Sequence, residues 1–405
     1  HLAMSDQMFW NFASGLPAPG VFPKELLSVS TTELLDNQMN FNYGTYGAPQ
    51  GVIESRNQIA EYLSNEFNDV ITGDQIALTC GVSGAVDLGL QIFSSPGDEI
   101  IVEDPTFYEV KSFVSQYNLT VVPIPTTDEG FNVDELERRL ESKEISPKLM
   151  YIIPDFSNPR GITLNEEKRK KLVKLAYKYE FMILSDEVYQ LLYFGDHAKT
   201  PKPMALYDLD EFHKSDSKGG VVSIGSVSKT IMPSLRLGWL FTRNSILLRK
   251  FYDRAVELSG GLHSFYSAGI FEAAIRNGMF DKRLSYLRNL YLERSSAMVS
   301  ALDSMITSLV NQEPKFEDKF RYHKPSGGFF IWMELPEWLN LNTPEAIESA
   351  KLNYSISYLA GTRASFISSY GNHCIRLCFV LYDPPVIQEG ISRLGEHILN
   401  EHKKI

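Results

Sequence analysis

The sequence predicts an α/β protein, with a mainly parallel sheet in a large domain and a smaller α+β domain after it. Between about residues 70 and 260, short apolar segments alternate with helical patterns, and a polar loop follows most of the apolar segments. Strands that are apolar throughout and separated by helices indicate a parallel sheet covered on both faces. The chain has 405 residues, more than one hydrophobic core normally serves, so a second, smaller domain is expected.

The expected elements of the large domain follow one another in strand, loop and helix order. Apolar periodicity and turn residues set their bounds. The expected strands are 76–79, 99–102, 121–124, 149–153, 182–185, 221–225 and 237–241. The expected helices are 52–67, 85–93, a segment ending near 117, 133–140, 165–179, 244–258 and 263–275. Ligands of such sheets bind at the carboxyl ends of the strands, and the polar motifs lie there.

The two ends of the chain are expected to form the smaller part of the molecule. Residues 1–45 predict an irregular arm with a helix near 22–35, and 46–295 predict the large domain. A long helix at about 281–309 leads into a small domain of residues 296–405. Its expected strands and helices are 326–334, 366–368, 374–380, 343–354 and 385–400. The polar segment 197–220 is expected to be a surface loop.

Composition narrows the classes of function. The net charge of −11 argues against nucleic acid or an anionic membrane as a partner, and no apolar run reaches the length of a membrane span. Cys80, Cys374 and Cys378 form no C-x-x-C motif, and the eight histidines show no metal-binding spacing. Neither a disulfide framework nor a metal site is therefore expected. Reduced cysteines and the lack of an apolar leader favour a cytoplasmic protein.

One stretch, 223–239, carries groups suited to a phosphorylated aldehyde. After an apolar strand, a loop of small residues contains Ser226, Ser228 and Lys229, and Arg236 follows seven residues later. A lysine between two buried strands needs a partner or loses its charge. Serine hydroxyls and a guanidinium are good phosphate ligands. The combination suggests a Schiff base with pyridoxal phosphate (PLP). Taken alone, such a stretch is more often a surface loop with a solvated lysine.

Three polar residues after other strands suit the ring of this cofactor. Asp186 ends a strand and can pair with the pyridine nitrogen, which makes the ring an electron sink. A helix N-cap is the ordinary alternative for such an aspartate. Tyr189 and Asn158 can reach the phenolic oxygen of the ring. Their ordinary alternatives are a core tyrosine and an Asn-Pro turn.

Further candidates concern the phosphate, the ring face and the substrate. The backbone N–H groups of Val82 and Ser83, in a loop before a helix, can hold a phosphate. Phe107 or Tyr108 can supply an aromatic face. Arg376 lies within an apolar strand, where an arginine is costly unless paired. An internal salt bridge or the α-carboxylate of a substrate would satisfy it.

The chain resembles the class I/II aminotransferases, the fold-type-I PLP enzymes. The resemblance rests on an ordered series of motifs: Gly81, Pro105-Thr-Phe107, Asn158-Pro-Arg-Gly161, Asp186-Glu-Val-Tyr189, Ser226-Val-Ser-Lys229, Arg236-Leu-Gly-Trp239 and Arg376. It covers nearly the whole chain and is nearest the α-aminoadipate/kynurenine-type and multi-substrate branch. It implies a mainly parallel sheet of the seven-stranded type in the large domain.

The resemblance implies a role for each residue at the cofactor ring. Lys229 is the expected Schiff-base lysine, which moves a proton at the substrate Cα, and Asp186 is the expected partner of the pyridine nitrogen. Asn158 and Tyr189 are expected to hold the phenolic oxygen. Lys229, Asp186 and Tyr189 are therefore the expected catalytic residues.

The phosphate, substrate and partner positions follow from the same resemblance. Arg376, with Asn158, is expected at the substrate α-carboxylate, and Gly15 of the arm is expected beside the substrate. Tyr46 looks like the family tyrosine that reaches the phosphate of the partner subunit, which implies a homodimer with shared active sites. The side chains expected at the phosphate are Ser226, Ser228 and Arg236.

Three sites depart from the family pattern. One is the phosphate loop, which has Val82-Ser83-Gly84 where relatives often carry polar or alanine residues, so that mostly backbone donors remain. Phe107 stands where many relatives have tyrosine, so stacking is kept and a hydroxyl hydrogen bond is lost. Whether Phe107 or Tyr108 stacks on the ring is left open. Arg160 stands where threonine is common and adds a positive charge near the site, with no assigned role.

The expected activity is ping-pong transfer of an amino group between an L-amino acid and a 2-oxo acid. A lyase or synthase of the same fold and a PLP-binding regulator without turnover are the alternatives. No arginine precedes Arg56, and Lys24 is the only cation of the arm. The apolar arm helix favours an aromatic or aliphatic substrate, alongside aminoadipate or glutamate as donor. Packing of the arm on the large domain would explain the same residues.

Overall fold

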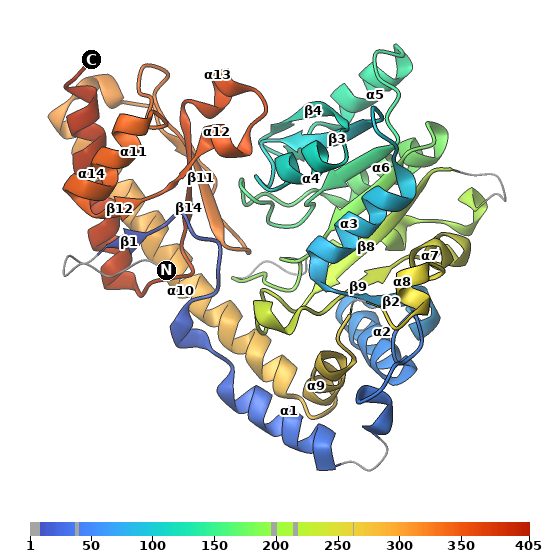
Figure 1. Ribbon diagram of the computed structural model, residues 1–405. Coiled ribbons are helices and arrows are strands. Elements are labelled where there is room, and N and C mark those ends of the chain that lie inside the picture. The colour runs from blue at the N-terminus through green and yellow to red at the C-terminus, as the bar shows by residue number, and fades with distance from the viewer. Residues whose placement is uncertain (1–8, 37–39, 196–200, 214–217, 262) are drawn as a thin grey trace.

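An eight-stranded sheet organises the large domain (Figure 1). Neighbouring strands are parallel, except that β9 runs antiparallel to β2 and β8, and the two-residue β5 antiparallel to β4. The predicted mainly parallel sheet is confirmed, with the short β5 added at one edge. In sheet order the strands are β2 (Ile76–Thr79), β9 (Gly238–Phe241), β8 (Gly220–Ser226), β7 (Met182–Asp186), β6 (Leu149–Ile152), β3 (Glu99–Asp104), β4 (Thr120–Thr127) and β5 (Gly130–Phe131).

The computed structural model describes residues 9–36, 40–195, 201–213, 218–261 and 263–405. The first eight residues of the predicted arm and parts of the predicted loop 197–220 lie outside the described residues. None of the helices within the described ranges is long and apolar enough to cross a membrane.

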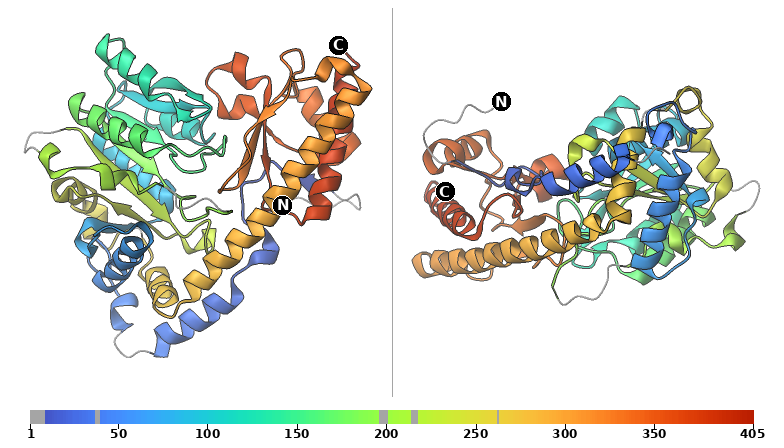
Figure 2. Two further views of the ribbon diagram at one scale, coloured as in Figure 1. Left: turned by 180° about the vertical axis from the view of Figure 1, so that it is seen from behind. Right: turned by 90° about the horizontal axis from the view of Figure 1, so that it is seen from below.

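Helices cover both faces of the large sheet, as the apolar strands predict. Figure 1 shows α3 and α4 in front of the sheet, and the reverse view in Figure 2 shows α5 and α6 on the other side. The helices of this part are α2 (Ile53–Phe67), α3 (Gly81–Phe93), α4 (Val110–Gln116), α5 (Val133–Glu141), α6 (Glu166–Lys178), α7 (Ser245–Tyr252), α8 (Ala255–Leu258) and α9 (Phe265–Arg276).

The small domain packs helices against an antiparallel sheet. The sheet order is β10 (Arg321–Tyr322), β11 (Phe330–Glu334), β14 (Cys374–Cys378) and β13 (Leu359–Ala360). The helix α10 (Met279–Gln312) runs from the large domain along the small one, where it packs on α14 (Pro384–His402). The remaining helices are α11 (Pro344–Tyr354), α12 (Gly361–Ala364) and α13 (Ser368–Gly371).

The arm reaches both domains. Its strand β1 (Trp10–Asn11) pairs in parallel with β12 (Ile356–Ser357) of the small domain, whereas its helix α1 (Lys24–Asp36) packs on α9. The proposed division at residue 295 falls inside α10, so this helix belongs to both parts. We keep the three-part division as a proposal.

Four expected elements differ from the structure. The strand expected at 366–368 is wrong: the backbone N–H groups of Phe366 and Ile367 donate to the Asp104 carboxylate instead of a neighbouring strand. The helix expected at 244–258 is interrupted between α7 and α8. The described part of the polar loop turns inward at Met204, which is fully buried. The helix expected from residue 85 begins at Gly81, so Val82 and Ser83 lie in its first turn.

Candidate active site

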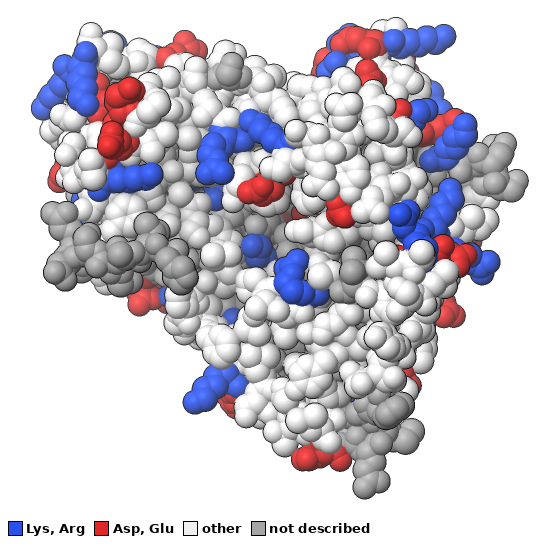
Figure 3. Space-filling view, viewed as in Figure 1, with Lys and Arg blue, Asp and Glu red and all other residues white. Residues whose placement is uncertain are grey.

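Side chains from the arm and both domains surround one cleft of about 390 Å³. Figure 3 shows a hollow between the two domains with Lys and Arg side chains at its mouth and within it. Most of the site residues predicted from the sequence line this cleft: Gly15, Val82, Ser83, Phe107, Asn158, Asp186, Tyr189, Ser228, Lys229, Arg236 and Arg376. Within the described residues, no group of three His, Cys, Asp or Glu side chains is arranged to hold a metal ion.

The topology of the large sheet explains why these side chains meet. The parallel strands β2, β6, β7 and β8 end at one edge, and the polar loops follow them there. Because β9 runs antiparallel, its first residues start from the same edge. Arg236, which precedes β9, therefore returns to the loop after β2, where it donates to the Cys80 carbonyl oxygen at 3.1 Å.

Lys229 projects from the loop after β8 into the cleft. Its Nζ donates to the carbonyl oxygen of Gly15 at 3.0 Å and lies 5.7 Å from the centre of the Phe329 ring. Burial lowers the pKa of the ammonium. A Cβ atom on Gly15 would lie 2.8 Å from Phe330, so this close approach of the arm requires glycine. The result is a lysine with increased access to its neutral, nucleophilic form.

Asp186 ends β7 at the floor of the cleft. Its Oδ2 accepts a hydrogen bond from the hydroxyl of Tyr151 at 2.7 Å, and its Oδ1 accepts one from the backbone N–H of Val188 at 3.3 Å. Burial raises the pKa of the carboxyl to about 6, and these hydrogen bonds oppose the rise. At neutral pH the cleft therefore presents a fixed carboxylate. The N-cap alternative does not apply, since no helix begins after Asp186.

Asn158 and Tyr189 lie between Asp186 and the small domain. The amide oxygen of Asn158 accepts a hydrogen bond from Arg376 Nη1 at 2.7 Å, which leaves its NH₂ group free to donate. Asn158 also hydrogen-bonds Tyr189, whose pKa is raised by burial. The Tyr189 ring packs edge-on against Phe329 and Phe330. Both side chains are donors in fixed positions.

Arg376 lies in the middle of β14, with 1% of its surface exposed. Its Nη2 donates to the carbonyl oxygen of Ala13 at 2.6 Å, and the guanidinium lies 4.0 Å from the centre of the Phe330 ring. Its Nε has no hydrogen-bond partner, and no described carboxylate lies within ion-pair distance. The salt-bridge alternative is therefore excluded within the described residues. A buried cation with an unused donor is suited to an anionic ligand.

The likeness to known proteins decides the family. A family model described as aminotransferase class I and II matches residues 12–394. The chain belongs to the class I and II aminotransferases. It is therefore a transaminase, of a family that uses PLP.

Two relatives illustrate the likeness of sequence. Aromatic-amino-acid aminotransferase 1 of Thermococcus litoralis is 32% identical over 399 residues, which cover 97% of this chain and 89% of that protein. The 2-aminoadipate transaminase of Thermus thermophilus is 28% identical over 388 residues, which cover 95% and 89%.

Two solved structures illustrate the likeness of fold. The multiple substrate aminotransferase of Thermococcus profundus matches with a TM-score of 0.84 and 26% identity, covering 98% of this chain and 93% of that one. The kynurenine aminotransferase of Pyrococcus horikoshii, in complex with PMP, matches with a TM-score of 0.83 and 28% identity, covering 98% and 92%.

The predicted phosphate position is a junction between the start of α3 and Arg236 that depends on a glycine. Val82 and Ser83 lie in the first turn of α3 and line the cleft, where their N–H groups lack helical acceptors. Gly81 has φ +71°, and a Cβ atom there would lie 3.0 Å from Arg236. Ser228 also lines the cleft. Helix N–H groups, a guanidinium and a hydroxyl are a suitable donor set for a phosphate.

Two predicted cofactor residues lie apart from this cleft. Ser226 is buried outside it, where its Oγ donates to the Leu237 carbonyl oxygen and accepts from the Ser228 N–H. It thus supports the Lys229 loop. Tyr46 is 85% exposed and does not line the cleft of its own chain. A role for Tyr46 requires a partner chain.

Phe107 and Tyr108 both line the cleft, with their rings edge to face at 5.2 Å. The guanidinium of Arg363 lies 4.6 Å from the centre of the Tyr108 ring. Because this cation occupies one face of Tyr108, Phe107 is the ring that we retain for stacking.

Arg160 points away from the cleft. Its Nη1 donates to the Thr126 hydroxyl at 3.0 Å and the Thr127 carbonyl oxygen at 3.1 Å, and its Nη2 lies 3.9 Å from Glu334. The expected positive charge near the substrate is therefore directed into the junction between β4 and the small domain. Arg160 therefore links β4 to the small domain instead of binding a ligand.

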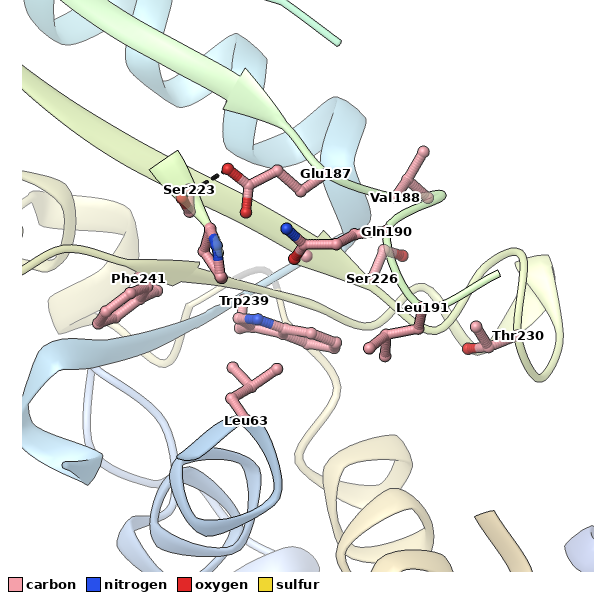
Figure 4. Close-up of a pocket in the computed structure, with 12 residues that line it drawn as sticks. Leu63, Glu187, Val188, Gln190, Leu191, Ser223, Ser226, Thr230, Trp239 and Phe241 are labelled. Carbon is pink, nitrogen blue, oxygen red and sulfur yellow. Dashed lines mark hydrogen bonds between the residues drawn. The ribbon is translucent and has the colours of Figure 1, made fainter. Parts of the chain in front are cut away.

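A second cavity below the Lys229 loop, shown in Figure 4, measures about 20 Å³. Glu187 faces it, and its Oε1 accepts hydrogen bonds from the Ser223 hydroxyl at 2.7 Å and the Met204 N–H at 2.8 Å. Trp239 packs there so closely that a Cβ atom on Gly225 would lie 2.2 Å from its ring. The cavity holds at most a water molecule. Asp186 and Glu187, although adjacent, therefore serve the cleft and the core respectively.

Sequence reasoning missed four contributors to the site. They are the carbonyl oxygens of Ala13 and Gly15, the hydroxyl of Tyr151 and the guanidinium of Arg363. No motif marks the carbonyls, because any residue has one. Tyr151 lay within a strand predicted as core, where a hydroxyl at a strand end was the one available signal.

Proposed function

We propose that this aminotransferase moves an amino group between an L-amino acid and a 2-oxo acid by a ping-pong mechanism, with PLP bound in the cleft. The observation that carries the proposal is Arg376, a buried cation with an unused Nε beside Asn158 in the same cleft as Lys229 and Asp186. PLP supplies an electron sink for the negative charge that develops at the substrate Cα.

Each residue of the cleft has a separate role in the proposed reaction. Arg376 and Asn158 bind the substrate α-carboxylate, and Asn158 and Tyr189 donate to the phenolic oxygen of the cofactor. Lys229 Nζ would hold the cofactor covalently, and its free amine would move the proton of the substrate Cα as general base and then as general acid. Its lowered pKa supports this role because the base must be the neutral amine. Asp186 keeps the ring nitrogen protonated.

The cofactor phosphate is assigned to the start of α3, Ser228 and Arg236, with Ser226 holding the loop. Tyr46 is assigned to the phosphate of the partner chain in a homodimer. Its 85% exposure leaves the ring accessible to a partner chain, as this assignment requires.

We infer a substrate range that includes aromatic, aliphatic and acidic amino acids. The cleft is also lined by Leu16, Ile153, Tyr108 and Phe330, which suit an apolar side chain. Arg363, exposed beside Tyr108 and without an ion-pair partner among the described residues, offers a cation for a second carboxylate. The names of the similar proteins, which concern aromatic amino acids, kynurenine and 2-aminoadipate, agree with this range.

The direct test is an absorbance screen of the purified protein loaded with PLP. Each of a panel of L-amino acids is added, with and without 2-oxoglutarate as acceptor. We expect a change in the cofactor spectrum with a subset of the panel, and 2-oxo acid beyond one equivalent only when the acceptor is present. Product without acceptor would indicate a lyase, and an unchanged spectrum throughout would indicate a regulator.

Lys229→Ala completes the test. We expect turnover to fall by about 10⁴-fold, because the variant lacks both the covalent anchor and the proton carrier. Parent-rate transamination by this variant would refute the assignment of Lys229. The control is Lys250→Ala on α7, a lysine that lies over Phe93 outside the cleft.

A further inference from the structure

A tyrosine on the strand next to β7 holds the carboxylate of Asp186. Tyr151 lies in β6, is 3% exposed, and donates its hydroxyl hydrogen to Asp186 Oδ2 at 2.7 Å. In the sheet Tyr151 is paired with Leu184, two residues before Asp186 on β7. Alternate residues of a strand share a face, so the phenol ring extends along that face to reach Asp186. The helix α3 closes the same face, because a Cβ atom on Gly89 would lie 2.8 Å from Leu184.

The carboxylate has one other hydrogen bond within the described residues, from the Val188 N–H to Oδ1 at the longer distance of 3.3 Å. The hydrogen bond from the Tyr151 hydroxyl is therefore the shorter of the two that orient the Asp186 carboxylate. A hydrogen bond to a charged acceptor that is shielded from water is worth more than an exposed one. Tyr151 has no other hydrogen-bond partner for its hydroxyl among these residues, so its polar atom serves Asp186 alone.

We propose that Tyr151 is a positioning residue of the reaction: its hydroxyl holds Asp186 in the orientation and charge state that the ring nitrogen of the cofactor requires. The proposal rests on the proposed pairing of Asp186 with that nitrogen. Tyr151 itself contacts neither substrate nor cofactor, and acts through Asp186.

The electrostatic surroundings of Asp186 explain why its carboxylate needs the hydrogen bond from Tyr151. Four titratable groups face it: Tyr151 from β6, Glu103 from β3, Tyr189 and Lys229. Burial raises the pKa of Asp186 to about 6 and that of Glu103 to about 8. Glu103 is thus mostly neutral at pH 7 and gives Asp186 no competing charge. Without the Tyr151 hydroxyl, the Asp186 pKa rises further toward neutrality, and the ring nitrogen loses part of its anionic partner.

The alternative is that Tyr151 only fills the core. Tyr151→Phe decides between the two, because it keeps the ring and removes the hydroxyl. Tyr177→Phe is a matched control: the Tyr177 hydroxyl also donates to an aspartate, Asp208 Oδ2 at 3.0 Å, but away from the cleft. Asp186→Asn, alone and combined with Tyr151→Phe, shows whether the effect passes through Asp186.

The experiment measures PLP affinity by titration of the cofactor-free protein, the pH dependence of the bound-cofactor spectrum, and kcat and KM. We expect Tyr151→Phe to weaken PLP binding by about 10-fold and to lower kcat by about 10-fold or more, with little change in KM. We also expect it to shift the pH titration of the cofactor spectrum, which a core-filling role would not do. Tyr177→Phe should stay within about 2-fold of the parent.

Two results would overturn the inference. One is a Tyr151→Phe variant that matches the parent in PLP affinity, spectrum and kcat. The other is an equal loss when the change is made in the Asp186→Asn background, since the effect would then not pass through Asp186. This second comparison holds even if the variant is less stable, because both backgrounds share the same packing change. A parent protein that binds no PLP, or an Asp186→Asn variant equal to the parent, would instead refute the proposed function.

Discussion

The two walls of the cleft are built in different ways. On the large-domain wall, Asp186 and Asn158 follow strands of one sheet. The Tyr151 hydroxyl and the Val188 N–H satisfy Asp186 in the free protein, and Asn158 accepts a hydrogen bond from Arg376 across the cleft. On the opposite wall, Arg376 donates to the carbonyl oxygen of Ala13 in the arm, 363 residues away, and keeps an unused Nε. The first wall is complete before any ligand binds, whereas the second is complete only with an anion. We call the large-domain wall, with Asp186 and Asn158, the cofactor wall, and the wall with Arg376 the substrate wall. The cofactor wall is thus preorganised, whereas the substrate wall selects an anionic ligand.

Arg376→Gln separates the two walls most clearly. We expect kcat/KM for every amino acid to fall by about 100-fold or more, the cost of removing one partner of a buried charged contact. PLP affinity should change by less than about 3-fold, because Arg376 belongs to the substrate wall. The measurements are steady-state kinetics and PLP titration.

A buried arginine far from the cleft serves as the control for Arg376→Gln. Arg56 is 6% exposed and donates to the carbonyl oxygens of Gly51 and Gly73. Arg56→Gln should lower stability without a selective loss of kcat/KM. A loss of PLP affinity as large as the loss of kcat/KM in Arg376→Gln would show that the walls are not independent.

A buried carboxyl beside Asp186, that of Glu103, makes the free energy of unfolding depend on pH. Burial raises the pKa of Glu103 from its usual value near 4.5 to about 8. The folded cofactor-free protein therefore holds this proton at pH values where the unfolded chain has lost it. Between pH 6.5 and 8, the free energy of unfolding should fall by about 1 kcal/mol per pH unit from this group.

Glu103→Gln tests whether Glu103 causes this pH dependence of the free energy of unfolding. Thermal melting of cofactor-free parent and variant is compared between pH 6.5 and 8. His263 and His397, whose pKa values burial lowers to about 4 in the folded protein, contribute equally to both proteins, so their effect cancels in the comparison. The parent should lose stability relative to the variant as the pH rises. Parallel curves would show that Glu103 is not protonated in the folded protein.

Arg363→Gln tests whether Arg363 favours substrates with a side-chain carboxylate. We expect kcat/KM for glutamate and 2-aminoadipate to fall by about 3- to 5-fold, the value of one exposed charge contact, with phenylalanine and leucine changed by less than 2-fold. Arg138→Gln, an exposed arginine on α5, is the control. Equal losses for acidic and apolar substrates would exclude a side-chain contact.

Arg160→Gln should have the smallest effect on catalysis. Its guanidinium bonds the end of β4 and faces Glu334, so we expect kcat and KM within about 2-fold of the parent and a loss of about 1–3 kcal/mol in the free energy of unfolding. Thermal or urea unfolding measures the loss. A change in KM with unaltered stability would place its charge in the cleft after all.

Much of the cofactor wall could be predicted because its chemistry is local to strand ends. Asp186, Asn158 and Lys229 each follow an apolar strand, and parallel strands deliver their ends to one edge. The direction of Arg160 could not be predicted, because the same loop can present a long side chain to either side. The strand expected at 366–368 failed for a related reason: Asp104, distant in sequence, takes its N–H groups.

By itself the sequence determined the α/β class, the lysine loop and the set of polar groups at strand ends, because periodicity and residue chemistry are written along the chain. Only the tertiary structure decided which carbonyls of the arm meet Lys229 and Arg376, that Tyr151 holds Asp186, and that Arg363 lies over the Tyr108 ring. Backbone oxygens are the same in every residue. Which of them faces a buried cation depends on how segments distant in sequence pack together, and no local pattern records that packing.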